Sequence, residues 1–223
     1  MMMRKKRVTL LAGHYGSGKT NIAVNLAFAR RADGGDVAVA DLDIVNPYYR
    51  AKDSEAELAA AGISLISSPF ANSNVDLPSL PQELYRIIDD QKTQMFVDIG
   101  GDDRGAYALG RFAEALKKED DYEMILVING YRPLTGDEKD TVTIMREIEE
   151  AGHLNFTAVI NNSNLGAETT AEDVLASAAY AEKTAAAAGL PLLMTTVRED
   201  LVPALTGKIE PLFGLKLQRS RIW

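Results

Sequence analysis

The feature that most constrains the fold is a glycine-rich stretch near the start of the chain, GHYGSGKT, between an apolar run and an amphipathic pattern. The apolar run, Arg7–Ala12, has the length and composition of a buried strand. The residues that follow the glycines, Lys19–Ala32, place apolar side chains at helical spacing. A strand that enters a helix through so short a loop begins a β-α-β unit, so this segment predicts a parallel sheet.

The same alternation of short apolar runs and helical patterns continues along the 223 residues. Predicted strands are Arg7–Ala12, Asp36–Asp41, Ile63–Ser67, Gln94–Ile99, Glu123–Asn129, Phe156–Asn161 and Leu192–Val197. Predicted helices are Lys19–Ala32, Asp53–Ala61, Pro81–Asp89, Gly105–Lys118, Gly136–Ala151 and Ala171–Ala188. Strands such as VAVAD and MILVI are apolar on both faces, as in sheets covered by helices on both sides. The sequence thus predicts an α/β fold, a three-layer, doubly wound, mostly parallel sheet of about seven strands, in a single domain over residues 1–223.

The glycine-rich stretch also matches the complete phosphate-binding pattern G-x-x-x-x-G-K-[ST] of P-loop NTPases, in the strand-loop-helix context that the pattern requires. Its glycines allow the backbone to wrap around an anion, and the loop amides and the helix N-terminus point at phosphates. Lys19 is expected to reach the β- and γ-phosphates, and Thr20 to bind Mg²⁺. The predicted nucleotide-contacting residues here are Gly13, His14, Tyr15, Gly16, Ser17, Gly18, Lys19, Thr20 and Asn21.

A second motif, Asp98-Ile-Gly-Gly101, ends the apolar strand MFVD. An aspartate at the carboxyl end of a neighbouring strand is where P-loop enzymes hold Mg²⁺, usually through water. Gly101 could then offer its backbone N–H to the γ-phosphate. The alternative is a tight turn after a strand with no ligand.

A third motif, Asp41-Leu-Asp43, closes another buried strand. Since parallel sheets bind ligands beyond the carboxyl ends of their strands, this pair is expected to face the phosphates. Asp43 is the candidate for orienting the attacking water or accepting its proton, and both carboxylates are candidate Mg²⁺ ligands. The alternative, strongest for Asp41, is that one carboxylate caps the turn.

In this order, GHYGSGKTN, DLDIVNP and VDIGGDD resemble the MinD/ParA/nitrogenase iron-protein group of P-loop ATPases, the CobQ/CobB/MinD/ParA nucleotide-binding group. The resemblance implies an ATPase that often dimerises around ATP and acts on a partner protein. It also implies that Asp43 is the catalytic carboxylate of a switch region, and that DIGGDDRGA is a second switch.

The chain departs from this group in two respects. The group's signature lysine stands at the position of His14, and a histidine with an ordinary pKa of about 6.5 is mostly neutral at pH 7. Arg50 and Arg104, each beside a proposed switch, could supply the missing charge, or could be ordinary surface arginines. The chain also has no cysteine, so it can hold no Fe–S cluster or thiolate-bound metal unaided.

The base pocket is expected after the strand FTAVI, where the chain reads Asn161-Asn-Ser-Asn164-Leu. P-loop GTPases tend to carry an aspartate at the position of Asn164, which accepts hydrogen bonds from guanine. A neutral amide is a weaker acceptor with donors of its own, so the sequence favours adenine, contacted by Asn161 or Asn162. The alternative is an ordinary polar loop after a strand.

The net charge of −8 argues against nucleic acid or an anionic membrane as partner. No stretch approaches the roughly 20 apolar residues of a membrane span, and a cytoplasmic location is expected. The favoured function is a Mg·ATP-dependent switch and slow ATPase that acts on a protein client, with a possible nucleotide-dependent homodimer. The alternative is an ATP-dependent small-molecule transferase or ligase resembling dethiobiotin synthetase or cobyrinic acid amidation enzymes, with its substrate site along Ser68–Pro81.

Overall fold

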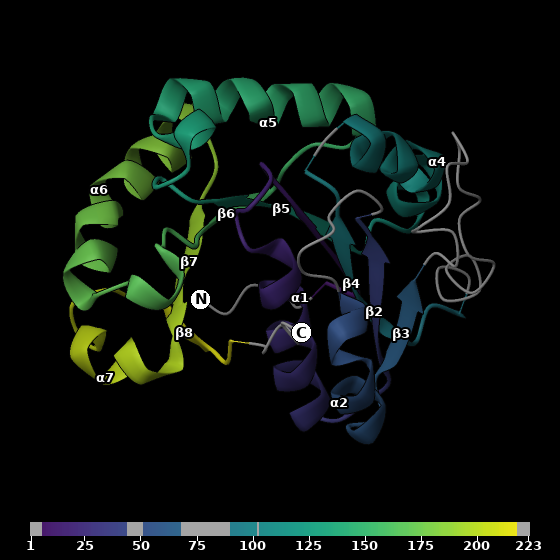
Figure 1. Cartoon of the computed structure of the whole chain (residues 1–223). Coiled ribbons are helices and arrows are strands. Elements are labelled where there is room, and N and C mark those ends of the chain that lie inside the picture. The colour runs from purple at the N-terminus through teal and green to yellow at the C-terminus, as the bar shows by residue number, and fades with distance from the viewer. Residues whose placement is uncertain (1–5, 44–50, 68–89, 102, 218–223) are drawn as a thin grey trace.

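The strands of the computed structural model, which describes residues 6–43, 51–67, 90–101 and 103–217, join in one sheet (Figure 1). Every neighbouring pair runs parallel, and the spatial order is β3-β2-β4-β1-β5-β6-β7-β8. The strands are β1 (Val8–Ala12), β2 (Val37–Leu42), β3 (Ser64–Ser67), β4 (Gln94–Ile99), β5 (Tyr122–Ile128), β6 (Ala158–Asn161), β7 (Leu192–Arg198) and β8 (Leu212–Leu215). The predicted doubly wound parallel sheet is confirmed.

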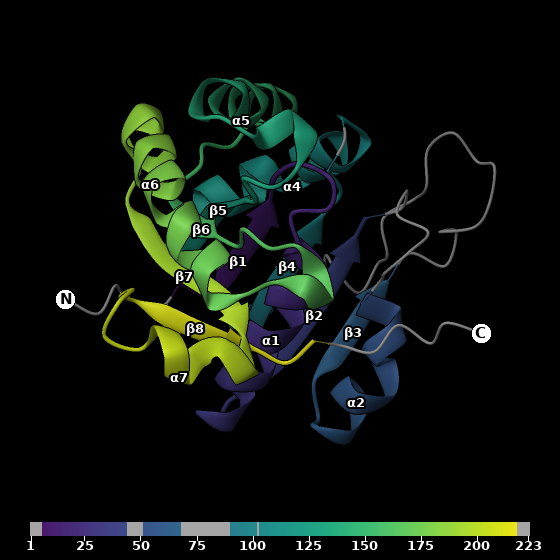
Figure 2. The ribbon, with the colours of Figure 1, turned by 60° about the vertical axis from the view of Figure 1, so that its left-hand side comes forward.

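Helices cover both faces of this sheet, which makes three layers (Figure 2). The described helices are α1 (Lys19–Ala32), α2 (Glu55–Ala60), α4 (Asp103–Glu119), α5 (Glu138–Gly152), α6 (Ala171–Ala188) and α7 (Val202–Leu205). Helices α4, α5 and α6 lie on one face, and α1 and α2 lie on the other. The short helix α7 lies beside β8 and α6.

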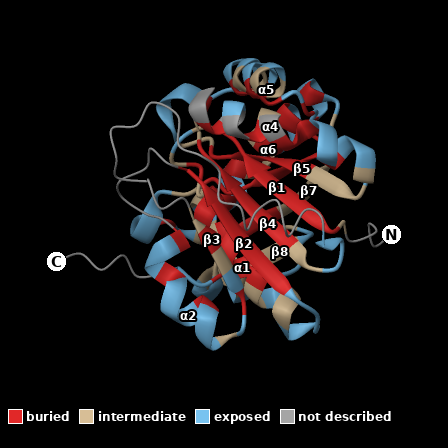
Figure 3. Ribbon diagram, turned by 90° about the vertical axis from the view of Figure 1, so that its right-hand side faces the viewer, coloured by how far each residue is buried: buried red, intermediate tan, exposed pale blue. Residues whose placement is uncertain are grey.

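The core follows from the alternation of side chains along the strands. Leu10 joins the cluster under α4, α5 and α6, which includes Leu109, whereas the next residue, Leu11, joins the cluster under α1, which includes Ile22. Both leucines are buried, and Figure 3 shows the sheet buried between helices with exposed outer sides. A strand buried on both faces must be apolar at successive positions, which explains the continuous apolar runs of the sequence.

Local signals set the helix boundaries that the sequence predicts best. Helix α6 begins after Thr170, whose hydroxyl accepts from the backbone N–H of Asp173 while the Asp173 carboxylate accepts from the Thr170 N–H. It ends at Gly189, which has the left-handed φ of 70°. This capping box and the C-terminal glycine satisfy backbone groups that a helix leaves unpaired at its ends.

Some of the predictions differ from the structure, and others lie outside the described residues. The prediction of about seven strands misses β8, a four-residue strand that contains Gly214 and is too short to carry an alternating pattern. The helix predicted from Asp53 begins at Glu55, after a 3₁₀ turn over Ala51–Ser54. The predicted helix Pro81–Asp89 and the loop Ser68–Pro81 lie outside the described residues.

Candidate nucleotide-binding site

The glycine-rich loop lies between β1 and α1, at the edge of the sheet where the parallel strands end. Gly13 has φ of 146°, and a Cβ there would lie 2.4 Å from the carbonyl oxygen of Val127. Gly18, the residue that caps α1, has φ of 92°, and a Cβ there would meet the Asn162 amide at 2.2 Å. Both positions therefore require glycine for conformation and for space.

Lys19 folds back along this loop. Its side chain is buried, and its Nζ donates a hydrogen bond of 3.3 Å to the carbonyl oxygen of His14. The ammonium is thus held beside the loop backbone, where the motif requires a cation for the phosphates. The positive charge of Lys19 and, more strongly, burial lower the pKa of His14, so this histidine is neutral at pH 7.

Thr20 and Asp98 form the centre of the site. The Thr20 hydroxyl donates to Oδ2 of Asp98 at 2.5 Å, whereas Oδ1 of Asp98 is buried with no hydrogen-bond partner. Burial, and then the carboxylate of Asp41, raise the pKa of Asp98 to about 8, although Lys19 and Thr20 act in the opposite direction. A buried carboxylate oxygen without a partner, next to a threonine hydroxyl, fits the hard oxygen ligands that Mg²⁺ prefers.

Asp41 lies beside Asp98, because β2 and β4 are paired with these two residues in register. Its Oδ1 accepts from the Asp43 N–H at 3.0 Å, and its Oδ2 accepts from the Ala51 N–H at 3.1 Å. This geometry favours the alternative in which Asp41 caps the turn after β2. Asp43 is buried at the start of that turn, directly before the residues outside the described part of the chain.

Within the described ranges, no three acidic or histidine side chains gather closely enough to hold a metal ion. A cation at Thr20 and Asp98 would therefore complete its coordination with phosphate oxygens and water. That is the usual arrangement for Mg²⁺, which keeps several waters and binds through few carboxylates.

Gly101 packs directly against the glycine-rich loop. A Cβ at Gly101 would lie 2.6 Å from the backbone nitrogen of Tyr15 and 2.9 Å from its Cα. The segment after β4 therefore touches the loop backbone and then enters α4 at Asp103. An anion held by the loop amides would lie next to the start of α4.

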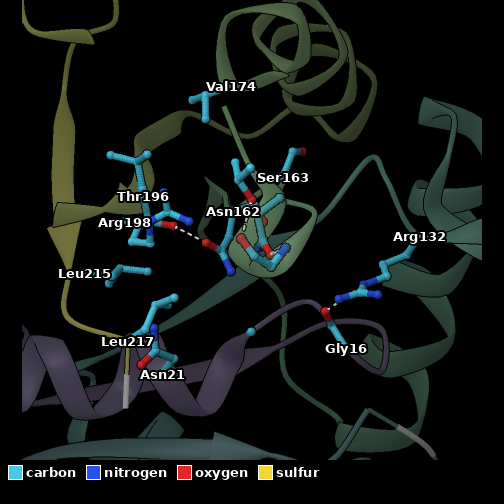
Figure 4. A pocket seen from close by; sticks show the side chains of 15 residues that line it. Gly16, Asn21, Arg132, Asn162, Ser163, Val174, Thr196, Arg198, Leu215 and Leu217 are labelled. Carbon is cyan, nitrogen blue, oxygen red and sulfur yellow. Dashed lines mark hydrogen bonds between the residues drawn. The ribbon is translucent and has the colours of Figure 1, made fainter. Parts of the chain in front are cut away.

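A cavity of about 240 Å³ opens beside the loop (Figure 4). Its walls come from the loop and the first turn of α1, from the segments after β5 and β6, from the end of β7, and from the end of β8 and the residues after it. They include Gly16, Asn21, Arg132, Asn162, Thr196, Arg198, Leu215 and Leu217. Apolar side chains beside a few convergent polar groups are typical of a small-molecule site. Its position next to the phosphate-binding loop makes it the candidate base and ribose pocket.

Of the two asparagines proposed for the base, only Asn162 lines this cavity. Its Nδ2 donates to the Ser17 carbonyl oxygen at 2.7 Å, and its Oδ1 accepts from the Thr196 hydroxyl at 2.8 Å. Asn161 is fully buried, with its Nδ2 donating to the Ser177 hydroxyl and its Oδ1 accepting from Ser163. Asn162 thus joins β6, β7 and the glycine-rich loop, whereas Asn161 fixes the loop after β6 to α6.

Asn164 also lines the cavity, but its amide is bonded to its own loop. Its Nδ2 donates to the carbonyl oxygen of Asn162 at 2.7 Å, and its Oδ1 accepts from the Gly166 N–H at 3.0 Å. This position therefore offers no carboxylate for a guanine edge.

Arg132 lines this cavity but is absent from the sequence-based site. Arg132 lies after the Asn-Gly turn that follows β5, a polar strand end that could have been included by its place in the fold. Arg50 and the side chain of Arg104, the two arginines beside the proposed switches, lie outside the described residues.

The sheet, the glycine-rich loop and the Thr20–Asp98 pair together define a P-loop nucleotide-binding domain. Residues 8–175 match the family of the CobQ/CobB/MinD/ParA nucleotide binding domain. The match covers most of the chain, which therefore belongs to this family, as its three sequence motifs indicate.

Solved structures share the fold. The chain is similar to the GDP complex of the 54 kDa signal recognition particle protein from Aeropyrum pernix K1, with a TM-score of 0.53 and 17% identity over 87% of this chain and 42% of that one. It is also similar to chloroplast FtsY from Physcomitrella patens, with a TM-score of 0.59 and 17% identity over 86% and 58% of the two chains. FtsY from Thermotoga maritima has a TM-score of 0.54 and 21% identity over 85% and 61%.

The chain thus spans less than two thirds of each of these three structures, and identities this low establish the fold alone. Curated protein sequences gave no match. Among the described residues, no helix has the length and apolar character needed to cross a membrane.

Proposed function

We propose that this protein binds Mg·ATP and acts as a nucleotide-dependent switch, with slow hydrolysis, on a partner protein. The observation that carries the proposal is the Thr20–Asp98 pair beside the glycine-rich loop, with one buried Asp98 oxygen lacking a hydrogen-bond partner. A hydroxyl and a carboxylate at this place hold Mg²⁺ in P-loop NTPases.

Different residues of the site would contact the phosphates, the Mg²⁺ ion and the attacking water. The loop amides and Lys19 would hold the β- and γ-phosphates, while Thr20 would bind Mg²⁺ directly and Asp98 through water. Bound Mg²⁺ would stabilise the negative charge that develops on the phosphate oxygens. Asp43 would orient the attacking water, because it lies buried directly after β2, the strand that pairs with β4.

The contact between Gly101 and Tyr15 supports a switch rather than a simple binding site. A γ-phosphate on the loop amides would meet the Gly101 backbone, which leads within two residues into α4. Because the contact has no spare space, occupation of the loop would bias the position of the start of α4. Tyr107, 65% exposed on the same helix, is available to a partner protein.

ATP rather than GTP is proposed because Asn164 replaces the aspartate that guanine recognition uses in P-loop GTPases. Its amide oxygen already accepts from Gly166, and its nitrogen is a donor where guanine needs an acceptor. One of the similar solved structures is described with GDP, so base preference has to be measured on this chain.

Calorimetric titration with Mg²⁺ and non-hydrolysable ATP and GTP analogues, followed by single-turnover hydrolysis of ATP, tests the proposal. We expect wild type to bind the ATP analogue more tightly, Lys19→Ala to lose binding, and Asp43→Ala to bind but not hydrolyse. Lys183→Ala, on α6 and away from the cavity, is the matched control. Undiminished turnover in both site variants would refute the proposal.

Other predictions about the whole protein stay predictions. The transferase or ligase alternative depends on Ser68–Pro81, which lies outside the described residues. The single-domain organisation, the cytoplasmic location, the protein client and the nucleotide-dependent homodimer all await experiments on the purified protein.

A further inference from the structure

Arg132 reaches the phosphate-binding loop from a distant part of the chain. Its Nε donates a hydrogen bond of 3.1 Å to the carbonyl oxygen of Gly16, 116 residues earlier in the sequence (Figure 4). The same side chain lines the candidate nucleotide cavity. Its two terminal NH₂ groups have no hydrogen-bond partner among the described residues, so four N–H donors are available beside the loop.

The segment that carries Arg132 is held firmly in place. Asn129, directly after β5, is fully buried; its Oδ1 accepts from the Tyr131 N–H, and its carbonyl oxygen accepts from the Arg132 N–H. The Thr135 hydroxyl donates to the same carbonyl at 2.8 Å. The Tyr131 hydroxyl donates to the Asp173 carbonyl oxygen at 2.7 Å, which ties the segment to α6. Arg132 is therefore presented to the loop by an ordered turn.

The glycine-rich loop lacks a positive charge that Arg132 could supply. His14, at the position of the signature lysine, is neutral at pH 7 because burial and Lys19 lower its pKa. A nucleoside triphosphate carries several negative charges, and Lys19 alone supplies one positive charge from the described loop. Guanidinium keeps its charge at any physiological pH and binds phosphate with paired N–H donors.

A single bond from an exposed arginine to a backbone carbonyl would by itself contribute little, since both groups are well solvated without it. The bond does, however, fix the Nε of Arg132, so that its terminal NH₂ groups can point at an anion in the cavity. We infer that Arg132 is a phosphate-binding residue that acts within its own subunit, supplying the positive charge that His14 does not. This inference rests on the proposed nucleotide function.

The test compares the binding of three probes: a non-hydrolysable ATP analogue, ADP and adenosine. For Arg132→Ala we expect the Kd of both phosphate-bearing probes to rise about tenfold or more, as for loss of a charge-assisted hydrogen bond. The Kd of adenosine should stay within twofold. Arg132→Lys should recover part of the loss at low salt, because it keeps the charge but loses the guanidinium geometry.

Arg146→Ala is the matched control, since this exposed arginine on α5 pairs with Glu149 and does not line the cavity. Equal losses for adenosine and the nucleotides would overturn the inference, because they would indicate a role in cavity shape. Unchanged binding of all probes would overturn it too. If wild type binds no nucleotide, the proposed function itself fails, whereas wild-type binding with an unaffected Arg132→Ala variant refutes only the role of Arg132.

Discussion

The Thr20 hydroxyl and the Asp98 carboxylate, 78 residues apart in sequence, are joined by a hydrogen bond of 2.5 Å. The bond connects the first turn of α1 to the end of β4, in the middle of the sheet. Because the other Asp98 oxygen has no partner, this pair is prepared for a cation rather than satisfied without one.

Thr20→Ala removes a proposed Mg²⁺ ligand. We expect the affinity for the ATP analogue in Mg²⁺ to fall about 10- to 100-fold, and to match wild type when both are measured in EDTA. Thr143→Ala, an exposed threonine on α5, is the control. Equal Mg²⁺ dependence in Thr20→Ala and wild type would show that Thr20 is not a ligand.

The raised pKa of Asp98 makes stability depend on pH. Between its ordinary pKa of 3.8 and about 8, the folded metal-free protein holds a proton that the unfolded chain has released. This group therefore lowers the free energy of unfolding as pH rises through that window. Asp98→Asn should remove this pH-dependent contribution. The urea midpoint of the variant in EDTA should therefore rise relative to that of wild type between about pH 5 and about pH 8. A constant difference between the two proteins would contradict the assignment.

Gly101→Ala tests the contact between β4 and the loop. The added methyl would meet the Tyr15 backbone at 2.6 Å, so one of the two segments must move. We expect a loss of about 1–3 kcal/mol in stability and about tenfold weaker binding of the ATP analogue. Gly110→Ala on α4 should instead be neutral or stabilising by up to about 1 kcal/mol, since its nearest contact is an ordinary 3.4 Å. Equal effects of the two variants would argue against a special role for Gly101.

His14→Lys restores the signature charge of the family. If the dimer geometry of the family is retained, this variant should dimerise more than wild type in the presence of the ATP analogue, or should hydrolyse ATP faster than wild type. Light scattering after size-exclusion chromatography measures the first, and single-turnover assays the second. His153→Lys, at the C-terminal end of α5, controls for added charge. Wild-type behaviour in both assays would show that position 14 does not face a partner.

Much of the fold could be predicted because its signals are local. Helix α1 begins directly after Gly18 of the glycine-rich loop, and α6 lies between the capping box at Thr170 and the terminal Gly189. The short strand β8 has no such signal, since it forms only by pairing with β7. The glycine-rich loop likewise carries its chemistry within eight residues, so its partner Asp98 could be sought at the end of another strand.

What the sequence by itself determined about this protein is the class of fold and the phosphate-binding loop. The fold class depends on short-range periodicity, and the loop depends on positions that only glycine can occupy. The tertiary structure alone decided which polar residues serve that loop. Asp41 and Asp98 look alike as strand-terminal aspartates. The amides of Asp43 and Ala51 donate to the two oxygens of Asp41, whereas Oδ1 of Asp98 is buried with no hydrogen-bond partner. Arg132 meets Gly16 only because the chain returns to the same sheet edge 116 residues later, a proximity that no local pattern encodes.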